Sequence, residues 1–122
     1  MGLFNVRTEV FSLRDSRVTR ELDFVVDTGA TYPVIPRDVA EELGVQLEEP
    51  RIFTLADGAH VTRDIGHVGF AYEGRRCISM VVIGEPEDVP RLGATALEQL
   101  GFEADPVAKT LRPARQYLLH HA

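Results

Sequence analysis

One short segment of the chain combines a carboxylate, two hydroxyls and small residues directly after an apolar run. Residues 24–31 read FVVDTGAT, so Asp27 follows three apolar residues and Gly29 comes two positions later. An ionised carboxylate is costly to bury unless it is paired or hydrogen-bonded. Asp27 is therefore either a residue that caps a turn or a group whose environment serves acid–base chemistry.

The residues on either side of this segment predict short elements that would hold Asp27 at the end of a core strand. Residues 3–13 and 18–26 are rich in β-branched and aromatic residues, which favours strands. A polar turn at residues 14–17 would join them. Residues 36–44 predict a short helix, because a proline stands near its start and a glycine at its end.

Further elements are predicted along the rest of the chain. Asp57-Gly58 between two alternating runs is a strong hairpin signal, so residues 51–68 should form a hairpin. The remaining predicted elements are a second hairpin with its turn at residues 73–76, an acidic loop at 85–90, a helix at 94–100 closed by Gly101, and paired strands within 102–113. No low-complexity linker separates these elements, so we expect a single domain over residues 1–122.

The composition bounds what the protein can do. The 122 residues carry a net charge of −6 with a pI near 5.1, so nucleic acid is not expected as a partner. The single cysteine, Cys77, excludes an internal disulfide. The apolar runs are too short to cross a bilayer, and the first residues lack the layout of a signal peptide. We therefore expect a cytoplasmic protein with no membrane partner.

The chain contains an internal repeat. A shift by 57 positions places FVV of residues 24–26 on VVI, and VAEELG of residues 39–44 on ALEQLG. Each half then reads as an apolar strand, a loop, a second short apolar stretch and a helix that ends in Leu-Gly. A shared composition of the two helices would also produce this match. In the second half Gly84 stands where the first half has Asp27, so the chain supplies only one carboxylate.

The motif and its surroundings resemble the retropepsin-like aspartic proteases. Residues 25–31, VVDTGAT, match the family's two apolar residues followed by Asp-Thr-Gly-Ala and a small polar residue. The hairpin tipped by Asp57-Gly58 stands where the family has its flap. The family's apolar-apolar-Gly element before a helix is similar to residues 91–93, except that Arg91 replaces one apolar residue. The likeness covers about residues 6–112.

The resemblance implies a fold and an assembly. The implied fold is all-β, an acid-protease-type bent closed β-barrel with an internal pseudo-two-fold repeat, a flap hairpin and one or two short helices. The implied assembly is a homodimer in which each subunit lends one aspartate. Symmetry would then replace the carboxylate that is missing at Gly84, and self-complementary two-fold dimers are the commonest oligomers.

The resemblance also implies roles for individual residues. Asp27, Thr28 and Gly29 would be the catalytic residues, with Thr28 bracing the twin loop across the dimer. Gly29 has no side chain, so it permits unusual dihedrals and a close approach of its N–H to the carboxylate. The expected contacts with an extended peptide or protein substrate are Ala30 and the flap residues Ala56, Asp57, Gly58 and Ala59. By residue type alone, Asp57 and Gly58 are turn formers.

A pair of Asp27 carboxylates would provide acid–base chemistry. Two carboxylates held about 3 Å apart share a proton and titrate as a coupled pair. The ionised group can take a proton from a water while the protonated one polarises the substrate carbonyl. We therefore expect an aspartic endopeptidase. The alternative is a catalytically silent dimeric module that binds an extended peptide in the same groove, and Asp27 as an ordinary turn residue also stays open.

Other chemistry fits the residues less well. An aspartate that accepts a phosphoryl group would need a second carboxylate or a Lys-Thr-Gly segment close by in the sequence, and neither is present. The segment Asp-Thr-Gly-Ala-Thr is also similar to the phosphate loop of sugar-kinase-type ATPases, but that fold needs a much longer chain. The four histidines, His60, His67, His120 and His121, lack the spacing of a zinc site. We expect neither a metal nor a cofactor.

Overall fold

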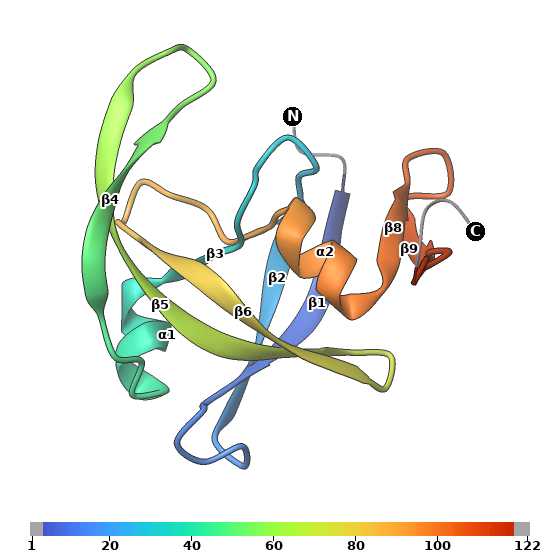
Figure 1. Cartoon of the computed structure of the whole chain (residues 1–122), viewed down its shortest axis with the longest axis horizontal. Coiled ribbons are helices and arrows are strands. Elements are labelled where there is room, and N and C mark those ends of the chain that lie inside the picture. The colour runs from blue at the N-terminus through green and yellow to red at the C-terminus, as the bar shows by residue number, and fades with distance from the viewer. Residues whose placement is uncertain (1–3, 119–122) are drawn as a thin grey trace.

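The protein is built mainly from β-strands (Figure 1). The computed structural model describes residues 4–118. The strands are β1 Phe4–Phe11, β2 Thr19–Val26, β3 Val34–Pro36, β4 Glu48–Thr54, β5 His60–Tyr72, β6 Arg75–Gly84, β7 Arg91–Leu92, β8 Phe102–Asp105 and β9 Thr110–Pro113. The helices are α1 Arg37–Glu42 and α2 Ala94–Leu100. The prediction of an all-β fold with short helices is confirmed.

Seven of these strands form one curved sheet. Their order is β1-β2-β7-β3-β6-β5-β4, and β1 also pairs with β5. Because β1 contacts both β2 and β5, the sheet bends back on itself around the buried side chains. Strand β4 lies at the outer edge beside β5, and β8 and β9 form a separate two-stranded sheet after α2.

The pairing of the short strands confirms the internal repeat. Strand β2 pairs in parallel with β7, and β6 pairs in parallel with β3. The shift by 57 positions converts the pair Val25↔Arg91 into Val82↔Val34. The antiparallel pair Val34↔Arg91 joins the two halves and maps onto itself. The carboxyl end of β2 therefore has its structural counterpart at the carboxyl end of β6.

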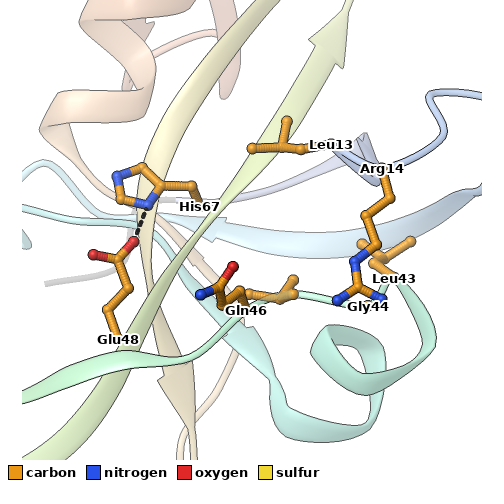
Figure 2. Close-up of a pocket in the computed structure, with 8 residues that line it drawn as sticks. Leu13, Arg14, Leu43, Gly44, Gln46, Glu48 and His67 are labelled. Carbon is orange, nitrogen blue, oxygen red and sulfur yellow. Dashed lines mark ion pairs between the residues drawn. The ribbon is translucent and has the colours of Figure 1, made fainter.

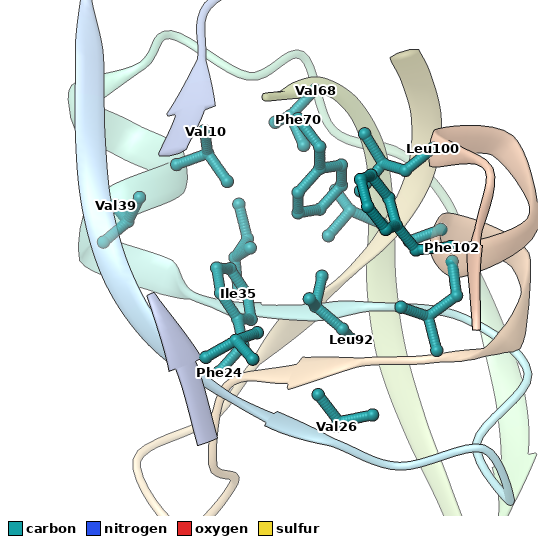
Figure 3. Packing of buried hydrophobic residues seen from close by; sticks show 14 of the residues in the cluster. Val10, Phe24, Val26, Ile35, Val39, Val68, Phe70, Leu92, Leu100 and Phe102 are labelled. Atoms are coloured by element: carbon teal, nitrogen blue, oxygen red, sulfur yellow. The ribbon is translucent and has the colours of Figure 1, made fainter. Parts of the chain in front are cut away.

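The core anchors the strands that flank the end of β2 (Figure 3). Phe24 and Phe70 are fully buried and pack edge to face, with ring centroids 5.9 Å apart. Ile35 of β3 and Leu92 of β7 are also fully buried. Burial of one such side chain contributes about 1.5–3 kcal/mol. Core contacts of this kind hold even the two shortest strands in place.

The β4–β5 and β5–β6 hairpins share one long strand. The sequence predicted two separate hairpins, but β5 runs without interruption from His60 to Tyr72. The turn between β5 and β6 consists of Glu73 and Gly74, whose φ angles are 50° and 79°. Two successive positive φ angles are typical of the two-residue hairpin turn that suits twisted strands. Arg75, expected within that turn, instead begins β6.

The C-terminal part follows the prediction closely. Helix α2 ends at Leu100, and Gly101 adopts the left-handed conformation expected of a glycine that closes a helix. Strands β8 and β9 then form the predicted pair. Neither helix of the described part is long and apolar enough to span a membrane. The extent of a single domain stays a prediction.

Candidate active site

Asp27 lies directly after β2, where two strands meet. Its side chain is buried, with the residue 5% exposed. The backbone N–H of Asp27 donates to Leu92 O of β7 at 3.1 Å. Because Val26 and Leu92 are paired and fully buried, the core fixes the point at which the carboxylate leaves the strand.

A tight turn supports one oxygen of the carboxylate. The Gly29 N–H donates to Asp27 Oδ1 at 3.0 Å, and the Ala30 N–H donates to Asp27 O at 3.1 Å. The close approach of the Gly29 N–H is thus present. Gly29 is not among the described glycines with positive φ, so its role here is the close approach of its N–H.

Arg91 contacts the other oxygen. Its Nη1 donates to Asp27 Oδ2 at 2.6 Å, forming an ion pair between side chains 37% and 8% exposed. Burial raises the pKa of the Asp27 carboxyl, but the hydrogen bonds from Gly29 and Arg91 are among the contacts that lower it, and the pKa lies below its ordinary value. The sequence signalled Arg91 only as a charge in an apolar position, and its place at the carboxylate was missed.

The start of α2 holds the loop that follows the motif. The Ala94 N–H donates to Ala30 O at 2.8 Å, and Thr95 donates to Thr31 O through both its N–H, at 3.0 Å, and its Oγ1, at 2.7 Å. These contacts satisfy helix N–H groups that have no partner within the helix. A Cβ on Gly93 would lie only 2.7 Å from Ala30 O, so this close packing requires a glycine.

Thr28 and Ala30 lie on this supported loop. Thr28 is exposed in the subunit and Ala30 is half-buried. The bracing role of Thr28 and the substrate contact of Ala30 stay predictions. On the same loop the Tyr32 ring packs edge to face on Phe53 of β4, with centroids 6.4 Å apart. That contact links the loop to the β4–β5 hairpin, and both lie toward the upper side of the view in Figure 1.

The tip of the β4–β5 hairpin is an ordered turn. The Leu55 N–H donates to Ala59 O at 2.7 Å, and the Ala59 N–H donates to Asp57 Oδ1 at 2.9 Å. Gly58 has a φ of 88°. Ala56, Asp57, Gly58 and Ala59 are all exposed. The geometry agrees with the turn-forming role of Asp57 and Gly58, and their contact with substrate stays a prediction.

Gly84, the counterpart of Asp27 in the second half, is closely packed. A Cβ on Gly84 would lie 3.1 Å from Val34 Cγ1, 3.2 Å from Asp88 Cβ and 3.3 Å from Ile35 O. These separations are tighter than ordinary van der Waals contact, and one neighbour is backbone. A side chain at this position would therefore require its neighbours to shift.

The two histidines of the described residues, His60 and His67, contact strand β4. His67 Nδ1 lies 2.8 Å from Glu48 Oε2, and His60 makes a side-chain hydrogen bond of 3.1 Å to β4. His120 and His121 lie outside the described residues. Within residues 4–118 no group of three or more His, Cys, Asp or Glu side chains is arranged to hold a metal ion.

A cavity of about 320 Å³ is formed by a different set of residues (Figure 2). It lies between the turn after β1, the end of α1 and the strands β4 and β5, and its walls include Leu13, Leu43, Glu48 and His67. None of the residues around this cavity is a predicted site residue. The candidate active site is the buried carboxylate of Asp27 at the end of β2, together with its turn and Arg91.

Comparisons with known proteins identify the family of the chain. Residues 13–83, more than half of the chain, match the model of a family described as aspartyl protease. The chain belongs to the aspartyl protease family and is an aspartic-type endopeptidase. Its resemblance to the retropepsin-like aspartic proteases is thereby confirmed.

A solved structure with the same fold is the EIAV protease complexed with the inhibitor HBY-793. The TM-score is 0.59 at 19% sequence identity, and the match covers 80% of this chain and 86% of that chain. At this identity the likeness shows the fold. A comparison with curated proteins gave no match.

Proposed function

We propose that the chain is one subunit of a homodimeric aspartic endopeptidase whose two Asp27 carboxylates form the catalytic pair. The observation that carries this proposal is the contrast between two equivalent positions. Asp27 is buried and hydrogen-bonded by its turn, whereas Gly84 carries no carboxylate and is closely packed against its neighbours. A second subunit related by a two-fold axis supplies the missing group.

The proposed pair hydrolyses a peptide bond without a covalent intermediate. Two neighbouring carboxyls share one proton, because both cannot ionise cheaply at short range. The ionised carboxylate takes a proton from a water, which attacks the substrate carbonyl while the protonated carboxyl polarises the carbonyl oxygen. In each subunit, the Gly29 N–H keeps Asp27 Oδ1 in position for this exchange.

The substrate in this proposal is an extended peptide segment. It lies between the loop that carries Thr28 and Ala30 and the exposed tip of the β4–β5 hairpin, residues 56–59, which acts as the flap. Thr28 braces the equivalent loop of the second subunit. The contact between Tyr32 and Phe53, which joins the loop to the hairpin, supports this placement of the peptide.

The direct test replaces the carboxylate by its isosteric amide. Asp27→Asn keeps an acceptor for the Gly29 N–H but cannot cycle a proton, so peptide hydrolysis should fall by about a hundredfold to ten-thousandfold. Asp23→Asn is the matched control, since Asp23 is an exposed aspartate on β2, the strand that leads to Asp27. Equal turnover by a folded Asp27→Asn protein would reject the proposal, and peptide binding without hydrolysis by wild type would favour the silent binding module.

A further inference from the structure

Arg91 is placed by its strand on the face of the sheet that carries the catalytic carboxylate. Leu92, its neighbour in β7, is fully buried in the core. Because successive side chains of a strand point to opposite faces, Arg91 points away from that core. It is 37% exposed, and its Nη1 reaches Asp27 Oδ2 at 2.6 Å. A cation in contact with the reacting group is thus open to solvent on one side.

The guanidinium of Arg91 has donors beyond the one that Asp27 uses. A guanidinium carries five N–H groups in a planar fork. Asp88 is the other nearby carboxylate, but it is occupied by Arg63 at 2.7 and 3.3 Å and by the Glu85 N–H at 2.8 Å. Among the described residues, Asp27 is the carboxylate with which Arg91 forms an ion pair. Arg91 can therefore bind one further anionic group from the solvent side.

The charge of the assembled site favours such a group. In the proposed dimer, two Arg91 side chains bring two positive charges, while two Asp27 carboxyls that share a proton bring one negative charge. The surplus positive charge lies beside the position where a peptide bond is cut. Guanidinium groups bind carboxylates through two parallel hydrogen bonds, which makes arginine selective for this partner.

We propose that Arg91 binds the side-chain carboxylate of an acidic residue next to the scissile bond, so that the enzyme cuts peptides at Asp or Glu. This inference rests on the proposed function. The substrate carboxylate binds to guanidinium donors that Asp27 does not use. Asp27 then shares the positive charge of Arg91 with the substrate and remains able to hold the catalytic proton. Since a two-fold axis places one Arg91 on each side of the cut, an acidic residue is accepted on either side.

The test compares peptides that differ only in one charge. Wild type digests two peptide libraries, one with Glu and the other with Gln at a fixed position, and this position is varied in turn. Mass spectrometry identifies the cleavage sites. Wild type should prefer Glu beside the cut by at least about tenfold in kcat/KM. Arg91→Met should reduce the preference to within about twofold, and Arg91→Lys should retain part of it. Arg112→Met is the control for the loss of one surface charge and should keep the full preference.

Two readouts need no variant, and the second also needs no turnover. The Glu preference of wild type should decline as salt is raised, because ionic strength screens a partly exposed charge pair. Immobilised wild type should enrich Glu peptides over Gln peptides from a library with a reduced, uncleavable central bond. A preference that survives Arg91→Met, or equal enrichment of Glu and Gln peptides, overturns the role of Arg91. Absence of any Asp27-dependent hydrolysis overturns the proposed function, while the binding readout still decides on Arg91.

Discussion

Burial and hydrogen bonding shift the pKa of Asp27 in opposite directions. Burial favours the neutral carboxyl, whereas the Gly29 N–H and the Arg91 guanidinium favour the carboxylate. In the proposed pair, one of the two carboxyls has to hold a proton during the reaction. Arg91 therefore opposes the protonated state that catalysis needs, and its removal should be visible in how activity depends on pH.

Arg91→Met should shift the acid limb of the pH–activity profile to higher pH. The sign follows from the direction of the contact: the guanidinium lowers the pKa of Asp27, so its loss raises the pKa values of the pair. The profile of kcat/KM for an uncharged peptide measures the shift, with Arg112→Met as control. An acid limb at the wild-type pH would show that Arg91 does not act on the pair.

Thr8 offers a stability prediction away from the site. It is 2% exposed, and among the described residues its Oγ1 is the buried side-chain oxygen or nitrogen without a hydrogen-bond partner. Thr8→Val replaces the hydroxyl by a methyl group of similar size, so it should raise the free energy of unfolding by about 1 kcal/mol. Denaturant unfolding measures the change.

Ser79 is the matched control for Thr8. It is 1% exposed, but its Oγ donates to Met80 O at 2.9 Å. Ser79→Ala removes a satisfied hydroxyl and should lower stability by about 0.5–1.5 kcal/mol. Opposite signs for the two variants are expected because one hydroxyl is bonded and the other is not. Loss of stability in both would mean that Thr8 Oγ1 has a partner in solution.

At the scale of elements, a pair of charged side chains fastens the hairpin strand β5 to the loop between β6 and β7. Arg63 donates to both oxygens of Asp88, at 2.7 and 3.3 Å, and the side chains are only 12% and 25% exposed. The hydrogen bond from Arg63 is the largest cause that lowers the pKa of Asp88. This contact keeps the base of the hairpin beside the strand that carries Arg91.

Arg63→Met should lower the free energy of unfolding by about 1–2 kcal/mol at neutral pH, because it removes a charged partner from a half-buried carboxylate. A depressed pKa in the folded state stabilises the protein above the unfolded carboxyl pKa of about 3.9, and this contribution is lost as pH falls through the folded pKa. The difference between wild type and variant should therefore shrink below about pH 4. A difference that is constant down to pH 2 would contradict an electrostatic origin.

The elements with local signals were predictable from the sequence. Proline near the start of α1, Gly101 after α2 and the Asp57-Gly58 turn each act through the conformation of one or two residues. The shift by 57 positions also identified the two equivalent halves. These features depend on neighbours in the chain, which sequence patterns report directly.

The features that escaped prediction depend on contacts between distant residues. Strands β3 and β7 contain three and two residues, too few for a pattern, and they exist because each pairs across the repeat. The ion pair of Asp27 and Arg91 spans 64 positions. An arginine in an apolar position indicated a departure from the family, but only the register of β7 beside β2 shows which group it meets.

At the scale of the whole molecule, the internal symmetry and the proposed dimer symmetry have different consequences. The pseudo-two-fold inside the subunit repeats strands and helices but not the carboxylate, since Gly84 is packed against Val34 and Asp88. A dimer axis repeats every residue, including Asp27. If the proposed dimer forms, the catalytic pair belongs to the assembly, and one inactive subunit should disable the site of its partner.

Mixing of subunits tests this last point. Equal amounts of wild type and Asp27→Asn, given time to exchange, should retain about a quarter of the activity of undiluted wild type, because random pairing leaves one-half times one-half of the dimers with two aspartates. Independent sites would retain about half. Native mass spectrometry of a mass-tagged subunit has to demonstrate exchange, since dimers that never exchange also give half. With exchange demonstrated, survival of half the activity would rule out a pair shared between two Asp27 side chains.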